Sequence, residues 1–205
     1  MPRKRRMENR KDYYFKLAKK EGYKSRASYK LKQINKKYNI FKGVSRVVDL
    51  CCSPGSWSQV IIEEIPDVTL VSIDLVNMSL TNPHITFIKG DITSESVFEK
   101  VYEILNGKAD LIVSDCSPKV SGIWSTDHAR QIFLAEYSFK YALRLLVKGG
   151  SLVMKVFQGD LLDELINLIK PCFEFFKIEK PPASRKSSAE IYFVAKGFKN
   201  CNVDI

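Results

Sequence analysis

The sequence has few of the residues that build metal centres. Its 205 residues include two histidines, His84 and His128, and five cysteines without a Cys-x-x-Cys pair. A bound metal ion is therefore not expected. No apolar run approaches the length of a membrane span, and the N-terminus is polar and basic, so neither a membrane segment nor a signal peptide is expected. We expect reduced thiols and a cytoplasmic location, with the nucleus or nucleolus as the alternative.

Positive charge is concentrated at one end of the chain. Residues 1–37 contain 15 Lys/Arg and 3 Asp/Glu, whereas the remaining residues carry a net charge of −2. Aromatic side chains alternate with these cations at Tyr13, Tyr14, Phe15, Tyr23 and Tyr29. Aromatic rings can stack on bases while cations hold phosphates. We expect a disordered basic tail at 1–10 and a basic helical appendage at 11–40 that binds RNA, within a single domain spanning 11–205.

Strands and helices alternate from residue 46 onward. Short apolar runs predict strands at Arg46–Leu50, Thr69–Asp74, Ile85–Lys89, Asp110–Asp115 and Ser151–Phe157. Periodic apolar positions predict helices at Asp12–Lys20, Ser25–Tyr38, Ser56–Ile65, Ser94–Leu105, His128–Val147 and Leu161–Ile169. Two further strand-like runs, Phe173–Glu179 and Glu190–Ala195, predict an antiparallel pair at the sheet edge. The fold class is therefore α/β, with a mostly parallel seven-stranded sheet and helices on both faces.

Helix boundaries are predicted from two local signals. Ser25 is of the residue type that caps a helix N-terminus. Gly149-Gly150 is expected to end the long helix and turn the chain into the next strand.

Four charged residues interrupt or end strands that should be apolar throughout. Asp74, Asp91 and Asp115 follow or close three predicted strands, and Lys155 interrupts the run from Leu152 to Phe157. In an open α/β sheet, the crevice outside the carboxyl ends of the strands binds ligands. A buried lysine is costly unless it is paired. We therefore expect these four side chains to meet in one crevice.

The loop after the first predicted strand lacks the glycines of a dinucleotide site. It reads Ser53-Pro54-Gly55-Ser56, so an NAD(P) oxidoreductase becomes a minor alternative. Asp74 stands where a Rossmann-type sheet places an acid on ribose hydroxyls, and Asp91 would face the base edge. Carboxylates also favour a cationic sulfonium over a phosphate. The pattern points to S-adenosylmethionine, although other adenosine ligands stay open.

Five stretches of the sequence match a known family. They read GYKSRASYKL at 22–31, VVDLCCSPGSWSQ at 47–59, SDCSP at 114–118, MKVFQG at 154–159 and KPPASRKSSAEIY at 180–192. On these stretches the chain resembles the FtsJ/RrmJ family of RNA 2′-O-ribose methyltransferases from about Asp12 to Phe198. The resemblance implies a Rossmann-like fold, S-adenosylmethionine as cofactor, RNA as partner and no metal.

The resemblance also implies roles for individual residues. The family's catalytic tetrad falls on Lys30, Asp115, Lys155 and Glu190. Lys155 would act as the base or orient the ribose hydroxyl, Asp115 would hold Lys155, and Glu190 would hold Lys30 or the ribose. The implied cofactor positions are Gly55, Trp57, Asp74, Asp91 and Asp115, and the implied RNA contacts are Lys24, Arg26, Lys30 and Arg185.

The substrate and the role of some aromatics stay open at this point. Residues 10–31 are similar to tRNA anticodon-loop enzymes, whereas 180–192 are more similar to nucleolar and archaeal enzymes that act on ribosomal RNA. We expect tRNA, with ribosomal RNA as the alternative, and an accessory protein subunit as a second partner. A non-catalytic RNA-binding module is the alternative from another class. Trp57 is interpreted either as core or as a wall of the cofactor site, and Trp124 either as an RNA-facing aromatic or as a loop anchor.

Overall fold

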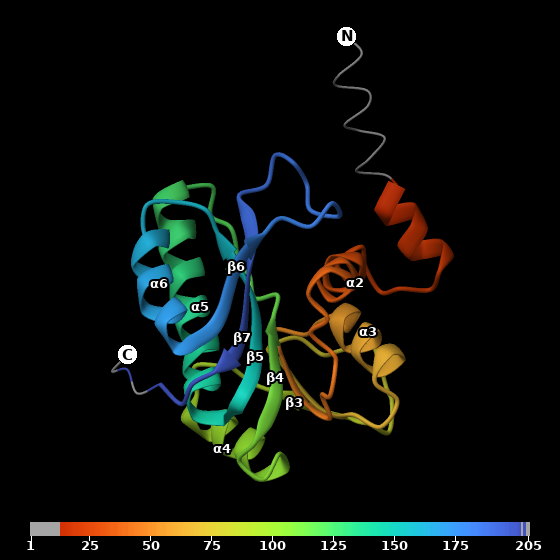
Figure 1. The fold of residues 1–205 in the computed structure, drawn as a ribbon. Helices are drawn as coiled ribbons and strands as arrows, with labels where there is room; N and C mark the ends of the chain where they lie inside the picture. The colour runs from red at the N-terminus through yellow and green to blue at the C-terminus, as the bar shows by residue number, and fades with distance from the viewer. Residues whose placement is uncertain (1–12, 202, 204–205) are drawn as a thin grey trace.

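A twisted seven-stranded sheet forms the centre of the protein (Figure 1). The computed structural model describes residues 13–201 and 203. The spatial order of the strands is β3-β2-β1-β4-β5-β7-β6. Strands β1 to β5 are mutually parallel, whereas β7 pairs antiparallel with both β5 and β6. The strands are β1 (Arg46–Leu50), β2 (Thr69–Asp74), β3 (Ile85–Lys89), β4 (Ala109–Ser114), β5 (Leu146–Phe157), β6 (Phe173–Glu179) and β7 (Glu190–Phe198).

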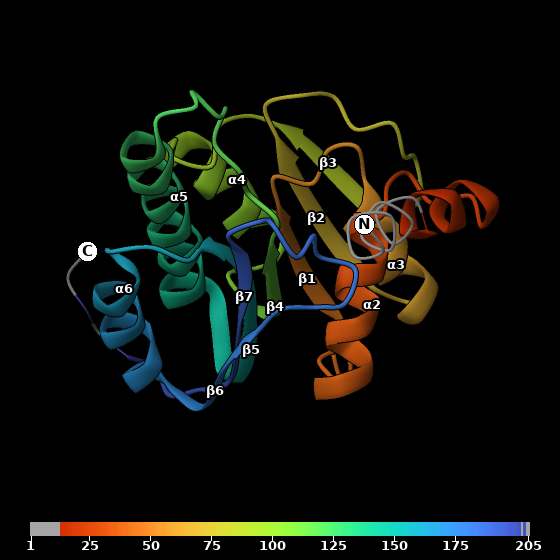
Figure 2. The same ribbon diagram turned by 90° about the horizontal axis from the view of Figure 1, so that it is seen from above.

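Helices cover both faces of the sheet (Figures 1 and 2). On one side lie α2 (Ala27–Tyr38) and α3 (Ser56–Glu64), and on the other lie α4 (Glu95–Ile104), α5 (Trp124–Leu145) and α6 (Leu162–Ile169). A helical stretch over 13–20 precedes α2, and a 3₁₀ turn, Lys170–Cys172, follows α6. None of the helices formed by residues 13–201 is both long and apolar enough to cross a membrane.

Two hydrophobic layers form because side chains alternate across each strand. In β1, Val48 and Leu50 belong to the cluster beneath α4, α5 and α6, whereas Val47 belongs to the cluster beneath α2 and α3. In β4, Ile112 faces the first cluster and Leu111 the second. Both faces of these strands are therefore buried, which explains their nearly continuous apolar sequences.

The structure confirms the predicted fold and corrects several boundaries. The long helix starts at Trp124 rather than His128 and ends at Leu145, so Gly149-Gly150 lie inside β5 instead of ending the helix. Arg26 is the N-cap residue of α2, not Ser25. The Ser25 hydroxyl instead accepts a hydrogen bond from the Ala27 N–H at 3.1 Å and meets the Ser56 hydroxyl at 2.7 Å. The predicted disordered tail at 1–10 lies outside the described residues.

The expectation of reduced thiols is wrong for four of the five cysteines. Cys51 directly follows β1 and Cys116 comes two residues after the neighbouring strand β4, and their Cα atoms lie 4.9 Å apart in a disulfide. A second disulfide joins Cys172 and Cys201, with a Cα–Cα distance of 5.1 Å. Both distances fall in the usual range for a disulfide. Cys52 is a buried free thiol.

Candidate active site

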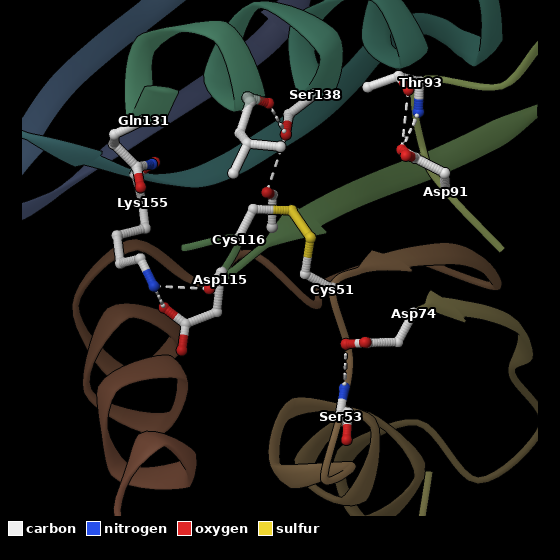
Figure 3. Close-up of a disulfide and its surroundings, with 12 residues drawn as sticks. Cys51, Ser53, Asp74, Asp91, Thr93, Asp115, Cys116, Gln131, Ser138 and Lys155 are labelled. Atoms are coloured by element: carbon white, nitrogen blue, oxygen red, sulfur yellow. Dashed lines mark hydrogen bonds and ion pairs between the residues drawn. A yellow bond between two sulfur atoms is a disulfide. The ribbon is translucent and has the colours of Figure 1, made fainter. Parts of the chain in front are cut away.

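The buried Lys155 and the half-buried Asp115 form an ion pair at the carboxyl end of the sheet (Figure 3). Ser114 of β4 lies beside Met154 of β5, so Asp115 and Lys155 come next to each other just beyond that register position. The Lys155 Nζ donates a hydrogen bond to the Asp115 carbonyl oxygen at 2.6 Å and lies 3.3 Å from the Asp115 Oδ1. Lys155 is only 5% exposed, and Asp115 is the acidic residue with which it forms an ion pair.

Lys30 and Glu190 form a second buried pair beside the first. Lys30 lies on α2 and Glu190 begins β7, and the distance from the Lys30 Nζ to the Glu190 Oε2 is 2.9 Å. Their charges compensate each other where few waters can reach, because the two residues are 5% and 9% exposed. Residues 160 positions apart in the sequence are thus brought together.

Tyr192 connects the two pairs, and the sequence-based prediction did not include it. Tyr192 lies opposite Lys155 in the antiparallel register of β5 and β7, so both side chains share one face of the sheet. Its hydroxyl donates to the Asp115 Oδ1 at 2.8 Å, and the Lys30 Nζ lies 5.5 Å from its ring centroid. Its position two residues after Glu190 in a strand places both side chains on the same face, a signal available from the sequence.

The electrostatics of this cluster keep Asp115 ionised. Burial alone would raise the pKa of its carboxyl group, but the charges of Lys155 and Lys30 and the Tyr192 hydrogen bond lower the pKa below its ordinary value. Conversely, burial and the neighbouring carboxylates raise the pKa of Tyr192, so its phenol keeps its proton and stays a donor. The cluster therefore holds a fixed negative charge between two ammonium groups.

The other predicted acids lie at the ends of β2 and β3, on the far side of the Cys51–Cys116 disulfide from Lys155 in Figure 3. Asp74 accepts the Ser53 N–H and the Val76 N–H, each at 2.8 Å. Asp91 is exposed and accepts the N–H and the hydroxyl of Thr93 at 2.9 Å. Among residues 13–201 and 203, no ion pair compensates either carboxylate, so this side of the site is acidic.

Asp49 adds a buried acid that the prediction did not include. It lies in β1, 1% exposed, and accepts the Ser58 hydroxyl at 2.6 Å, while its Oδ1 has no hydrogen-bond partner within the described part of the chain. Burial raises the pKa of its carboxyl group to about 7, partly offset by the Ser58 hydrogen bond and reinforced by the charges of Asp115 and Asp74. An uncompensated carboxylate at this depth favours a nearby cation or proton.

Gly55 sits where the loop is closely covered. Its φ is 105°, and a Cβ at this position would lie 2.9 Å from Leu80 Cβ and 3.0 Å from Met78 Cγ. Only glycine fits this backbone conformation and this approach. Trp57, by contrast, is 2% exposed and donates its indole N–H to the Ala27 carbonyl oxygen at 3.0 Å, so it anchors α2 in the core. A cofactor contact by Trp57 stays a prediction.

Two of the predicted RNA contacts, Arg26 and Arg185, lie near each other and near Glu190, on the Lys30 side of the cluster. Lys24 and Arg185 are exposed, and Arg26 is half-buried at the start of α2. The loop that carries Arg185 packs on α2 because the Ala183 N–H donates to the Gln33 side chain at 2.9 Å, and Figure 2 shows this loop crossing toward α2. Burial and the nearby Arg185 charge lower the pKa of Arg26, as expected of two cations held close together.

Known proteins are similar to this chain in sequence and in fold. The chain is 45% identical over 193 residues to the ribosomal RNA large subunit methyltransferase E of Archaeoglobus fulgidus, covering 94% of this chain and 99% of that protein. It is also 45% identical over 188 residues to the enzyme of the same name from Methanothrix thermoacetophila, covering 92% of this chain and 73% of that protein. A crystal structure of a Plasmodium falciparum protein described as a ribosomal RNA methyltransferase superposes with a TM-score of 0.76 at 32% identity, over 86% of this chain and 98% of that one.

The sheet order and the buried charge cluster define a Rossmann-like methyltransferase, the class to which these relatives belong. The FtsJ-like methyltransferase family model matches residues 23–198. The chain belongs to the FtsJ-like methyltransferase family. The predicted resemblance and the predicted enzyme class are thereby confirmed.

Proposed function

We propose that this enzyme transfers a methyl group from S-adenosylmethionine to a ribose 2′-hydroxyl of ribosomal RNA. The relatives at 45% identity are named ribosomal RNA large subunit methyltransferases, which favours ribosomal RNA. The preference for a tRNA anticodon loop, expected from residues 10–31, has no support among these relatives, and the ribosomal alternative fits better. A similar N-terminus is a weak guide because a basic helix contacts phosphates in any RNA.

The single observation that carries the proposal is the charge division of the site. The ends of β2 and β3 carry the carboxylates of Asp74 and Asp91, and β1 carries the buried acid Asp49. Lys30, Lys155 and the nearby Arg26 line the side near β5 and β7. A cationic sulfonium nucleoside suits the acidic half, and a polyanionic RNA suits the basic half. Asp115 lies between the halves, which is where a methyl group would pass from one to the other.

The residues present fit the proposed cofactor. The Asp74 carboxylate is fixed by two backbone N–H groups and suits ribose hydroxyls, and Asp91 suits the base edge. Buried Asp49, which accepts the Ser58 hydroxyl and has an unpartnered Oδ1 among the described residues, would add negative charge when a nearby cation keeps it ionised. When bound, S-adenosylmethionine would supply an electrophilic methyl group. The protein's contribution is to hold the nucleophile in line with it.

Lys155 and its neighbours would align that nucleophile. The Lys155 ammonium donates a hydrogen bond to the Asp115 carbonyl and forms an ion pair with the Asp115 carboxylate, which fix its Nζ in one place. The remaining donor direction of Nζ can orient a 2′-hydroxyl oxygen, and Lys30, held by Glu190, can bind the adjacent phosphate. Alignment of this kind accounts for much of the rate of an in-line transfer.

The test is methyl transfer from labelled cofactor to unmodified RNA. We expect transfer to large-subunit ribosomal RNA, as free RNA or in assembling subunits, and little transfer to tRNA transcripts. Nuclease digestion should recover the label as a 2′-O-methylated nucleoside. If tRNA acquires the label and ribosomal RNA does not, the substrate assignment is reversed. If the label is recovered on a base, ribose methylation is excluded. Cofactor and RNA binding without any transfer would identify a non-catalytic RNA-binding module.

A further inference from the structure

An exposed apolar cluster lies on the loop that leaves the catalytic strand β4. Val120 is 67% exposed, Ile123 is 62% exposed and Trp124 is 48% exposed. This loop starts at Asp115, directly after β4, and leads into α5, whose first residue is Trp124. Neighbouring large apolar side chains left in water on one loop commonly mark a surface that binds another molecule.

The loop is held in place rather than loosely attached. Asp127, only 2% exposed, accepts hydrogen bonds from the Ser121 N–H at 2.7 Å, the Ser121 hydroxyl at 2.8 Å and the Gly122 N–H at 3.0 Å. A buried carboxylate that accepts three hydrogen bonds fixes the backbone at Ser121 and Gly122, directly before Ile123. The apolar side chains are therefore presented in a defined arrangement.

Trp124 rests on two other rings at nearly parallel angles. Its ring lies 5.6 Å from the His128 ring at an interplanar angle of 12°, and 6.2 Å from the Phe157 ring at 19°. His128 is buried and accepts the Leu161 N–H at its Nε2 at 3.1 Å. Gly159 lies so close to His128 that a Cβ there would fall 2.7 Å from the imidazole ring. The rings that Trp124 contacts are thus fixed by their surroundings, while Trp124 itself stays 48% exposed.

This stack is adjacent to the reaction site. Phe157 and Lys155 belong to β5 and point to the same face, which places them about 7 Å apart along the strand. The loop 180–189 rises at the same end of the sheet as the start of α5 in Figure 1, and it carries Arg185. A nucleotide next to the one bound at Lys155 would reach Trp124.

We propose that Trp124, supported by Val120 and Ile123, is a stacking platform for an unpaired RNA base next to the methylated nucleotide. The inference rests on the proposed function and deepens it, because it assigns recognition of the flanking nucleotide to this loop. Aromatic rings accept any base face, and exposed Lys119 in the same loop can bind the backbone phosphate. Three apolar residues of one loop suit a single base better than a stable protein interface, which takes roughly 20–30 residues on each side.

The experiment combines protein and RNA changes. Trp124→Ala and Trp124→Phe are compared with the matched control Phe133→Ala, an equally exposed aromatic further along α5. RNA affinity and single-turnover methylation are measured at saturating cofactor. We expect Trp124→Ala to weaken RNA binding about tenfold, within the range known for base–aromatic stacking. Trp124→Phe should recover most of the affinity, and cofactor binding and Phe133→Ala should match the wild type.

An abasic substitution in the RNA separates stacking from an effect on folding. RNAs lacking the base on the 5′ or on the 3′ side of the target nucleotide are bound to each protein. One of the two abasic RNAs should bind the wild type more weakly, by about the same factor as Trp124→Ala weakens binding of intact RNA. Trp124→Ala should bind that abasic RNA as well as it binds intact RNA, because the base and the ring contribute through the same contact. The proposal would be overturned if Trp124→Ala bound intact RNA as tightly as the wild type does. It would also be overturned if, for both abasic RNAs, the loss from the missing base simply added to the loss from the missing ring.

Two other outcomes are distinguished by the same experiment. If Trp124→Ala keeps its RNA affinity but no longer co-purifies with an accessory protein subunit that binds the wild type, the loop belongs to a protein partner and the proposal is overturned. Failure of the wild type to methylate any RNA would refute the proposed function instead, and it would be visible before any variant is compared. The abasic RNAs test the wild type directly, so the result does not depend on the stability of Trp124→Ala.

Discussion

At the scale of single residues, burial decides which charges act at the site. Lys155 is a buried lysine whose charge is met by Asp115, and Lys30 is met by Glu190. The sequence indicated Lys155 because two apolar residues flank it on each side. Lys30 and Glu190, by contrast, were identified only through the family resemblance. Their pairing depends on a contact between α2 and β7, which local sequence does not encode.

Asp49 gives a prediction about pH. Its folded-state pKa of about 7 lies above the unfolded value of about 4, so between these values the folded protein binds a proton that the unfolded chain does not. Stability from this group is therefore present at low pH and lost as the pH rises toward 7. We expect Asp49→Asn to remove this loss. The free energy of unfolding of the variant relative to that of the wild type should therefore be on the order of 4 kcal/mol higher at pH 8 than at pH 4.

Chemical denaturation of wild type and variant between pH 4 and pH 8 measures this difference. The exposed Asp67→Asn serves as the matched control, and its curve should run parallel to the wild type. A constant difference between Asp49→Asn and wild type over the whole range would show that Asp49 is not held as a buried acid.

At the scale of elements, α2 matters because it carries Lys30 onto the sheet. Trp57 of α3 donates to the Ala27 carbonyl, and the Ser28 hydroxyl donates to the Ser56 carbonyl at 3.1 Å. These contacts join the N-terminal ends of α2 and α3. The sequence predicted both helices, but it did not predict that Trp57 and Ser25 would serve their junction.

Trp57→Phe should loosen this junction. The change removes one buried hydrogen bond and part of the ring volume, so we expect the free energy of unfolding to fall by about 1–3 kcal/mol. The single-turnover rate should fall as well, because Lys30 would be less firmly placed. Tyr141→Phe is the control, since the buried Tyr141 hydroxyl has no hydrogen-bond partner among the described residues and its loss should cost little. Equal stability of both variants would exclude the anchoring role.

Element boundaries show where sequence signals compete. The bounds of β1, β2, β3 and β6 agree with the prediction, because apolar runs between polar turns define a buried strand clearly. The predicted start of β5 lies five residues too late, because a glycine pair is a typical helix stop signal. In the structure β5 runs through the glycine pair, and its pairing with β4 has an irregular register between Ala109 and Leu111. Tertiary pairing overrides a local breaker signal in this case.

At the scale of the whole molecule, two disulfides connect distant segments. Cys51–Cys116 closes a loop of 65 residues and Cys172–Cys201 one of 29 residues. Composition alone predicted free thiols, because spacing does not show that β1 and β4 become neighbours. Loops of this size correspond to roughly 4 kcal/mol of stabilisation each in the chain-entropy account.

Thiol titration tests the cysteine pairing. Protein unfolded in denaturant without reductant should expose one reactive thiol, that of Cys52, and after reduction it should expose all five. Peptide mapping should recover the linked pairs Cys51–Cys116 and Cys172–Cys201. Five thiols before reduction would mean that the pairs are not oxidised in solution.

The most direct test of the central claim is the methylation rate of Lys155→Ala at saturating cofactor. The variant should bind S-adenosylmethionine and RNA within a few-fold of the wild type, because the acidic half of the site and most phosphate contacts are untouched. Its single-turnover rate should fall at least about a hundredfold, the usual cost of losing a group that positions or accepts the reacting proton. A folded Lys155→Ala protein that binds both ligands and methylates at nearly the wild-type rate would contradict the account.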